Sequence, residues 1–387
     1  MDNIAGSKSS LTWAVHISVA ALVFLWLFPT IGLFVSSFRT ADQISSSGWW
    51  ASLFPAEQTI QLRTGGGDAA VQEGDLWVVE GNLLVDHEDS PGTDVTLTRF
   101  GVSSRDVSAY AIGETAEFGD GAETVTLSAN GDYRYTSTEE PGRRGQRVFI
   151  TAEVPPEFTL GNYQTILFSG TGQDNMAKAF FNTLTVTVPA TIIPIVVAAF
   201  AAYALAWMDF PGRALLIALV VALLVVPLQL ALIPLLRLHL GIGIGKGYLG
   251  VWLAHTAFGL PLAIYLLRNY MVGLPRDIIE NAKVDGATDF QIFTKIILPL
   301  SFPALASFAI FQFLWTWNDL LVAKVFLIDA TGSTTVMTNQ IVELLGTRGG
   351  NWEILATAAF VSIAVPLVVF FAMQRYLVRG LLAGSVK

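Results

Sequence analysis

The sequence predicts an all-α membrane protein with six transmembrane helices and one β-rich segment outside the membrane. Hydrophobic residues make up 53% of the 387-residue chain, charged residues make up 14%, and the mean hydropathy is +0.56. This is not the composition of a soluble enzyme. Six stretches are predominantly apolar over about 20 residues, the length that crosses the hydrocarbon core. A polar segment, residues 39–178, separates the first stretch from the second.

The six predicted spans are residues 12–38, 183–207, 214–236, 249–268, 301–323 and 353–376. The first is too long for the apolar core of a signal peptide and lacks a clean cleavage site, so we expect a retained anchor. Basic residues in the short connections indicate orientation. With the N-terminus inside, nine lie on the inner side and four on the outer: Lys8, Arg213, Arg268, Arg276, Lys283, Lys295, Arg375, Arg379 and Lys387 against Arg237, Lys246, Lys324 and Arg348. We therefore expect both termini in the cytoplasm.

The polar segment is acidic and predicts a small antiparallel β-domain at about residues 57–155. It holds 21 of the 31 Asp and Glu residues but 9 of the 22 Lys and Arg residues. Its net charge is therefore negative, which argues against nucleic acid as a partner. Strand-like runs lie at 76–80, 95–100, 124–127 and 148–151, separated by glycine-containing turns. Asn130-Gly131 predicts a hairpin. The chain has no cysteine, which excludes disulfides and thiolate chemistry but leaves the compartment open.

A polar interruption between the fourth and fifth spans carries the most specific motif. It contains Glu280-Asn281-Ala282-Lys283-Val284-Asp285-Gly286 and, after nine intervening residues, Ile296-Ile297-Leu298-Pro299. Charges recur at helical intervals from Arg276 to Lys295. Gly286 favours a sharp turn or a close backbone approach between two short helices, and we expect Pro299 in the first turn of the next span. The stretch is either a docking element or an ordinary amphipathic loop.

This spacing resembles the EAA loop of binding-protein-dependent ABC importer permeases, with Asn281 where the family usually has alanine. The segment Phe158–Tyr163 resembles the F-T-L-x-N-Y that in the family follows the first span closely, so the β-rich block looks like an insertion. The tail from Gln374 to Gly384 resembles that of maltose-type sugar permeases, and the large insertion resembles permeases of alpha-glucoside importers.

The resemblance implies the type I ABC importer permease fold: residues 1–38 as a cytoplasmic start and span, 39–178 as a periplasmic segment, and 179–387 as a five-span core with a coupling loop at 271–299. It implies a non-enzymatic subunit of a bacterial inner-membrane sugar importer, for an alpha-glucoside or maltose-type oligosaccharide. The implied partners are a second permease, two ATPase subunits, a periplasmic or lipid-anchored solute-binding protein, and membrane lipid. ATP and magnesium would be bound by the ATPases, and no cofactor by this chain. The residues implied to couple to the ATPase are Glu280, Asn281, Ala282, Asp285, Gly286 and Pro299.

Polar and aromatic residues in the spans suggest a solute path. Phe311, Trp315, Asn318 and Val322 follow helical spacing and would share one face, next to Asp319. An aromatic ring beside an amide suits a sugar, but helix packing explains the same pattern. Gln229 in the third span is costly against lipid and should face protein or a water-filled path. Both interpretations of the fifth span stay open.

The other patterns carry less. Gly241–Gly247 fails as a phosphate loop, because Leu240 and Gly247 stand where glycine and Ser/Thr are required. His255 is expected to be a satisfied packing residue rather than a ligand, and the acidic run Asp86, Glu88 and Asp89 is a solvated turn or a calcium site. No metal site or catalytic arrangement is expected. The rival functions are a solitary carrier or channel, which would show ion sites or broken helices in inverted repeats, and a membrane-anchored receptor.

Overall fold

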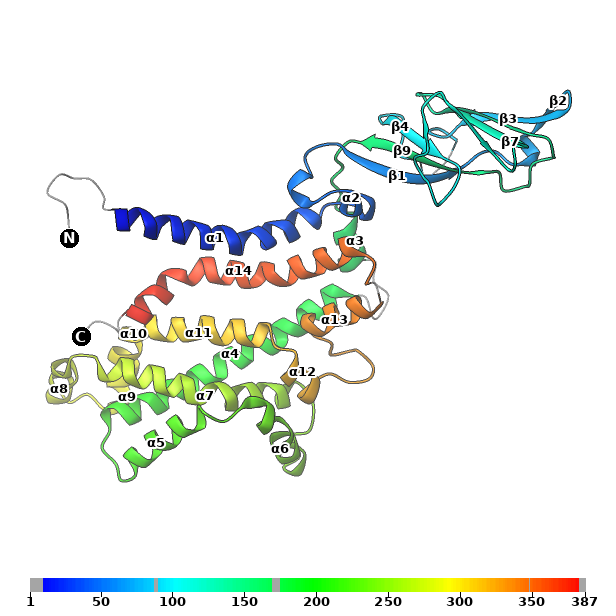
Figure 1. The fold of residues 1–387 in the computed structure, drawn as a ribbon. Coiled ribbons are helices and arrows are strands. Elements are labelled where there is room, and N and C mark those ends of the chain that lie inside the picture. Colours follow the sequence, from blue (N-terminus) through cyan, green and yellow to red (C-terminus); the bar gives the residue numbers. More distant parts are fainter. Residues whose placement is uncertain (1–9, 87–89, 169–174, 348, 383–387) are drawn as a thin grey trace. The chain divides into compact units, whose positions relative to one another are not determined.

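A computed structural model describes residues 10–86, 90–168, 175–347 and 349–382 (Figure 1). The chain divides into two units, which we describe separately. The first is Met1–Asn162 with Asn351–Ala356, and the second is Tyr163–Gly350 with Thr357–Lys387.

The first unit begins with the apolar helix α1, Ser10–Ser36, followed by the short helix α2, Ala41–Ser46, and a 3-10 turn, Trp49–Ala51. Thr40 caps α2 by accepting a hydrogen bond from the amide of Gln43. Arg39 is buried, and its guanidinium donates to the carbonyls of Gln43 and Ser47 at 2.6 and 3.0 Å. These bonds satisfy carbonyls at the end of α2 and fix the chain as it leaves α1.

The β-domain has two antiparallel sheets. Its described strands are β1 Ala56–Arg63, β2 Val71–Glu73, β3 Leu76–Asn82, β4 Thr96–Gly101, β5 Tyr110–Ala111, β6 Thr115–Phe118, β7 Glu123–Leu127, β8 Asp132–Ser137 and β9 Arg147–Val154. One sheet has the order β1-β9-β4-β5 and the other β2-β3-β8-β7-β6. The four predicted strand runs lie in β3, β4, β7 and β9, so those predictions are confirmed.

Side-chain alternation along the strands builds one core from both sheets. In β8, Tyr133 and Tyr135 are buried while Arg134 between them is exposed. The buried side chains of one sheet, such as Val125, join those of the other, such as Ile150, in a single hydrophobic cluster. The predicted hairpin is also present, because β7 pairs with β8 and Gly131 has a φ of +88°.

The two ends of the β-domain return to the same place in the first unit. The amide of Thr159 donates to the carbonyl of Phe38 at 2.7 Å. The side-chain amide of Asn162 donates to the carbonyls of Ser37 and Arg39 at 3.0 and 2.9 Å. The chain that enters the β-domain is therefore hydrogen-bonded to the chain that leaves it.

The second unit is helical. Its elements, with the two helices that cross the unit boundary, are α3 Gly161–Phe168, α4 Met176–Trp207, α5 Arg213–Leu223, α6 Leu228–Gly241, α7 Tyr248–Val272, α8 Arg276–Val284, α9 Asp289–Ile292, a π-helix Phe293–Ile297, α10 Leu298–Leu300, α11 Phe302–Trp317, α12 Leu321–Phe326, α13 Met337–Thr347 and α14 Trp352–Leu382. In Figure 1, α8 lies at the end of the helices where α10 also lies. Small residues of α4, such as Ala198 and Ala202, pack with Ala263 of α7, which lets the two helices approach closely.

The helices that could span a membrane differ in part from the predicted spans. Among the described residues, α1, α4, α7 and α14 are long and apolar enough, and the number rises to six if each of two bent pairs is one span. Residues 214–236 do not form one helix, because α5 and α6 meet at 112°. Pro227 at the break has no N–H, and a proline disfavours the α conformation in the residue before it. The fifth stretch is also interrupted, since α11 ends at Trp317.

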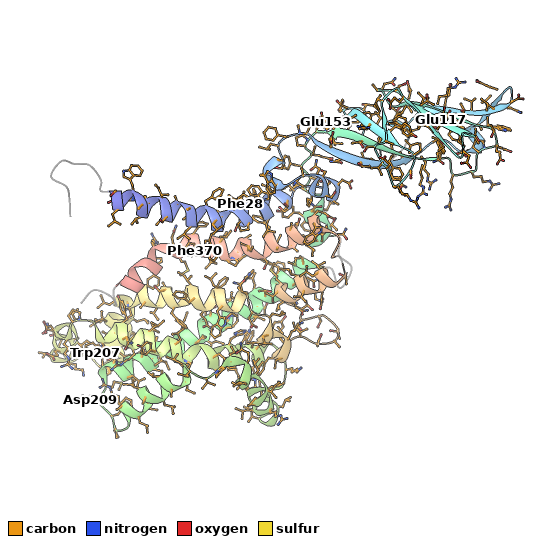
Figure 2. The ribbon with its side chains drawn as sticks, in the orientation of Figure 1. Phe28, Glu117, Glu153, Trp207, Asp209 and Phe370 are labelled. Carbon is orange, nitrogen blue, oxygen red and sulfur yellow. The ribbon has the colours of Figure 1, made fainter. Side chains whose placement is uncertain are left out.

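We expect the β-domain to fold without the rest of the chain, because it has its own core and its ends lie together. A fragment covering residues 55–156 should give the circular dichroism of antiparallel sheet and unfold cooperatively. Replacing the buried Ile150 by alanine should lower its free energy of unfolding by about 2–5 kcal/mol. The control Glu117→Ala, at an exposed position labelled in Figure 2, should change it by less than about 0.5 kcal/mol. A fragment with no cooperative transition would contradict this prediction.

Candidate functional site

Helix α8 has one buried face and one exposed, charged face. Ile279 and Ala282, three residues apart, are buried in the core of the second unit. Glu280, Asn281 and Asp285 are exposed. The same short helix is therefore held from the inside and presents polar groups on the outside.

Gly286 ends α8 in the way that the spacing predicts. Its φ is +79°, in the left-handed region. Its amide donates to the carbonyl of Lys283, and the amide of Ala287 donates to the carbonyl of Ala282, the hydrogen-bond pair of a Schellman motif. A Cβ at Gly286 would meet no atom within 4 Å. Within this chain, Gly286 is therefore needed because of its left-handed backbone conformation. A larger side chain would not collide with any neighbouring atom.

A capping box starts the next helix. The Thr288 hydroxyl accepts from the amide of Gln291, and the Gln291 side chain accepts from the amide of Thr288. Asp289 lies 3.8 Å from the Lys283 ammonium and accepts from the Tyr203 hydroxyl at 3.4 Å. The exposed ion pair contributes little to stability, but the tyrosine joins the loop to α4.

The chain then enters the bundle through the π-helix. Ile292, Phe293 and Ile297 are buried. The Phe293 ring lies 4.7 Å from that of Phe200 and 5.2 Å from that of Tyr203, both on α4. π-Helical turns are rare and often lie at functional sites. Here the turn directs apolar side chains from the loop into the core formed by α4, α7 and α11.

The placement of Pro299 differs from the prediction. It lies in the three-residue helix α10, and the longer helix α11 begins at Phe302 after a bend of 70°. Pro303 instead opens α11, so the expectation of a proline in the first turn holds for another residue. The motif spacing predicted a proline near the start of this helix, but it could not show that the helix axis bends between α10 and α11.

Two exposed apolar residues of this surface escaped the sequence analysis. Val284 is 86% exposed and Phe290 is 65% exposed, one on each side of Gly286. They were detectable in principle, since helical periodicity places Val284 away from Ile279 and Ala282. We call Glu280, Asn281, Val284, Asp285, Gly286 and Phe290 the loop surface.

The predicted face of the fifth span is present in α11 but ends sooner. Phe311 and Trp315 are 45% and 40% exposed, and Asn318 is also exposed. Val322 is buried and belongs to α12, so its assignment to this face is wrong. Asn318 is the C-cap of α11, and its side-chain amide donates to the carbonyl of Leu314 at 2.9 Å.

Asp319 starts α12 instead of continuing α11. Its carboxylate accepts from the amides of Val322 and Ala323 at 3.2 and 3.0 Å. One carboxylate oxygen also lies 3.6 Å from Nε2 of His255, too far for a hydrogen bond. His255 is buried as predicted, yet neither of its ring nitrogens has a hydrogen-bond partner among the described residues. The expectation that it is satisfied is therefore wrong.

Gln229 lies on α6 and is exposed in this chain. It does not line the neighbouring apolar cavity of about 440 Å³, which α5, α6 and α7 form with Trp315. A different glutamine, Gln312 of α11, is buried and donates to the carbonyl of Ala190 at 3.1 Å. A Cβ at Gly259 would lie 2.5 Å from the Gln312 side-chain oxygen. Glycine at 259 therefore leaves room for this polar contact, which sequence reasoning missed although Gln312 interrupts an apolar run.

The remaining candidates, which are the acidic run and the glycine-rich loop, do not form a binding site in the described part of the chain. The described residues contain no group of three potential metal ligands. Of the acidic run, Asp86 accepts from the amide of Asn82, while Glu88 and Asp89 lie outside the described residues. In the glycine-rich loop, the amide of Gly247 is bonded to the carbonyl of Phe326. The bend of 112° between α5 and α6 was not expected from the sequence, which predicted one continuous span over residues 214–236.

Comparison with known proteins identifies the relatives. Residues 173–382 match the family described as binding-protein-dependent transport system inner membrane component. The alpha-glucoside transport system permease protein AglG of Rhizobium meliloti is 58% identical over 98% of both chains. The osmoprotective compounds uptake permease protein GgtD of Synechocystis is 42% identical over 96% of this chain and 91% of its own. The trehalose transport system permease protein SugB of Mycobacterium tuberculosis is 35% identical over 60% of this chain and 84% of its own.

The contacts of Asp319 predict that it stabilises the junction of α11 and α12. Asp319→Ala removes two capping acceptors and should lower the free energy of unfolding by about 0.5–2 kcal/mol. Asp319→Asn keeps one acceptor oxygen and should cost less. The neighbouring control Asn318→Ala removes one exposed hydrogen bond and should cost less than about 0.5 kcal/mol. Thermal unfolding in detergent measures all three, and equal losses would show that capping is not the role of Asp319.

Proposed function

The chain belongs to the family of inner membrane components of binding-protein-dependent transport systems, and on that premise we propose that it is the permease subunit of an ATP-driven sugar importer. The family is one of transport components rather than enzymes. The names of AglG and SugB favour an alpha-glucoside or related oligosaccharide as solute. The observation that carries the proposal is the loop surface, which is exposed on one side and anchored in the helix core on the other.

In this proposal the loop surface contacts an ATPase subunit. Glu280 and Asp285 supply carboxylates, and Val284 and Phe290 supply exposed apolar area for a partner to cover. Asn281 lies among them. Ala282 faces inward and ties α8 to the core. Pro299, in α10, lies between the loop and the spanning helix α11.

The packing suits transmission of movement. A displacement of α8 and α9 must carry Ile279, Ile292 and Phe293, which pack among residues of α4 and α7. Close-packed interiors shift between discrete arrangements instead of deforming smoothly. Closure of an ATPase pair would therefore move these helices together and exchange inward for outward access. ATP and magnesium would be bound by the ATPases, not by this chain.

The remaining subunits and the orientation follow the same proposal. The complex would contain a second related permease, two ATPases and a periplasmic or lipid-anchored solute-binding protein. Six spans would place both termini and the loop surface in the cytoplasm. The β-domain would be an insertion outside the membrane, a proposal supported by the hydrogen bonds between Phe38 and Thr159 and between Asn162 and Ser37. Its strongly acidic composition suits contact with a protein partner and not with the lipid interior.

The exposed stripe of α11 is our candidate for the solute path. Phe311 and Trp315 offer ring faces, and the Asn318 amide is exposed beside them. Gln229 on α6 is a further exposed amide. The alternative function, a solitary carrier or channel, would give the loop surface no partner. Copurification of a cytoplasmic ATPase with the chain separates the two.

The coupling role predicts a charge dependence at α8. Glu280→Lys reverses an exposed charge at the proposed contact and should weaken retention of the ATPase at least about tenfold. Uptake and ATP hydrolysis stimulated by the binding protein should fall together. The control is Asp209→Lys in the turn before α5, which reverses another exposed carboxylate outside the loop surface (Figure 2). It also breaks the surface ion pair of Asp209 with Arg213, which contributes little to stability. Equal retention in Glu280→Lys and the unaltered chain would contradict coupling through α8.

A second series separates backbone strain from obstruction at Gly286. Gly286→Ala carries the left-handed strain, of about 1–2 kcal/mol, without a long side chain. Gly286→Arg carries the same strain and adds bulk where this chain leaves open space. We expect both variants to reach the membrane and only the arginine variant to lose the ATPase strongly. Equal loss in both would mean that the turn conformation matters and that no partner covers the position.

The solute path predicts loss of uptake without loss of assembly. Trp315→Ala and Asn318→Leu should lower uptake while the affinity for the binding protein and the subunit composition stay unchanged. The matched control is Phe371→Ala, because Phe371 is a 62% exposed aromatic residue on α14. Normal uptake in both variants would contradict the solute path and would show that Trp315 and Asn318 serve only helix packing.

A further inference from the structure

The aromatic segment that follows α2 folds back along α1. The Trp49 ring lies 4.6 Å from the ring of Phe28, and the Trp50 ring lies 6.4 Å from it in a stacked orientation. Phe28 is labelled in Figure 2, on the part of α1 that leads to α2. The chain therefore leaves α1, forms α2, and returns beside the last turns of the helix.

Two glycines make the return possible. A Cβ at Gly32 would lie 2.7 Å from the indole nitrogen of Trp49, so a larger residue would displace that ring. A Cβ at Gly48 would collide with the Trp50 ring. Arg39 holds the intervening loop through the carbonyls of Gln43 and Ser47. The position of both indoles is thus fixed by packing.

The segment leaves its large apolar side chains uncovered. Trp50, Leu53 and Phe54 are 68%, 73% and 68% exposed. On α2 the exposed side chains include the polar Asp42, Ser45 and Ser46. One short stretch of chain thus presents an apolar patch, Trp50, Leu53 and Phe54, beside a polar helix.

The length of α1 places this patch relative to a bilayer. A helix of 27 residues is about 40 Å long, roughly 10 Å more than the hydrocarbon core. If the excess is shared, about 5 Å of α1 projects at each end. Gly32 and Phe28 lie about 6 and 12 Å before the end at Ser36. Trp49 and Trp50 therefore lie near the boundary between hydrocarbon and headgroups.

We propose that Trp49, Trp50, Leu53 and Phe54 form a lipid-interface anchor that holds the start of the β-domain at the membrane surface. Tryptophan is enriched at this boundary because its ring is apolar and its N–H is polar. The aromatic segment also adjoins an exposed apolar part of α1, because the ring of Phe24, which is 67% exposed, lies 5.7 Å from that of Phe28. Lipid is the occupant that already surrounds an apolar spanning helix. The assignment holds whichever side of the membrane α1 ends on.

The absence of cysteine from the sequence makes the test direct. Leu53→Cys and Phe54→Cys, at exposed positions, are each labelled with a nitroxide in the full chain and reconstituted in phosphatidylcholine–phosphatidylglycerol vesicles with its partner subunits. Asp42→Cys and Ser45→Cys on α2 are the matched controls. Collision with oxygen reports lipid, and collision with a water-soluble nickel chelate reports water.

We expect labels at 53 and 54 to collide with oxygen several-fold more, and with nickel several-fold less, than labels at 42 and 45. In the Leu53→Cys background, adding Trp50→Ser should shift the label toward water, while Trp50→Phe should not. Nickel access equal to that of the controls would place the segment in water and overturn the proposal. Low access to both reagents would show that a protein subunit covers the patch, which would overturn it equally.

Discussion

The burial of a few apolar side chains beneath α8 and α9 is the constraint on which the account depends. Ile279, Ala282, Ile292 and Phe293 lie in the same core as the ends of α4 and α7. A polar loop between two spans would otherwise be free to move without moving the helices. Because its inner face is part of the core, the loop surface is rigidly joined to the spanning helices. Its charged outer face can then serve a partner.

Glycines support this arrangement in two different ways. Gly286 has a positive φ and open space around it, so its role within the chain is to turn the backbone. Gly259 is surrounded, and its missing side chain makes room for Gln312 between α11 and α4. The first shapes a surface and the second lets helices carry a polar group in their interior. A glycine in an apolar sequence can therefore indicate close packing as well as a turn.

The sequence predicted those features of the fold that depend on residues close together in the chain. Strand-like runs between turn residues located strands such as β7, and the motif spacing located a turn at Gly286, where the structure has a positive φ. Hydropathy located the spanning regions but not their bends, since apolar composition is the same on both sides of Pro227. The capping role of Asp319 and the unsatisfied ring of His255 depend on contacts between distant residues. The exposure of Val284 and Phe290 depends on which face of the loop the core covers.

The most direct test of the central claim is to identify what the loop surface touches in the assembled complex. A photo-crosslinking amino acid at Val284 or Phe290, both exposed and outside the core, leaves the packing beneath them intact. Irradiation in cells followed by mass spectrometry should identify a cytoplasmic ATPase subunit as the crosslinked partner at both positions. Crosslinks to lipid alone, or to no protein at either position, would contradict the account.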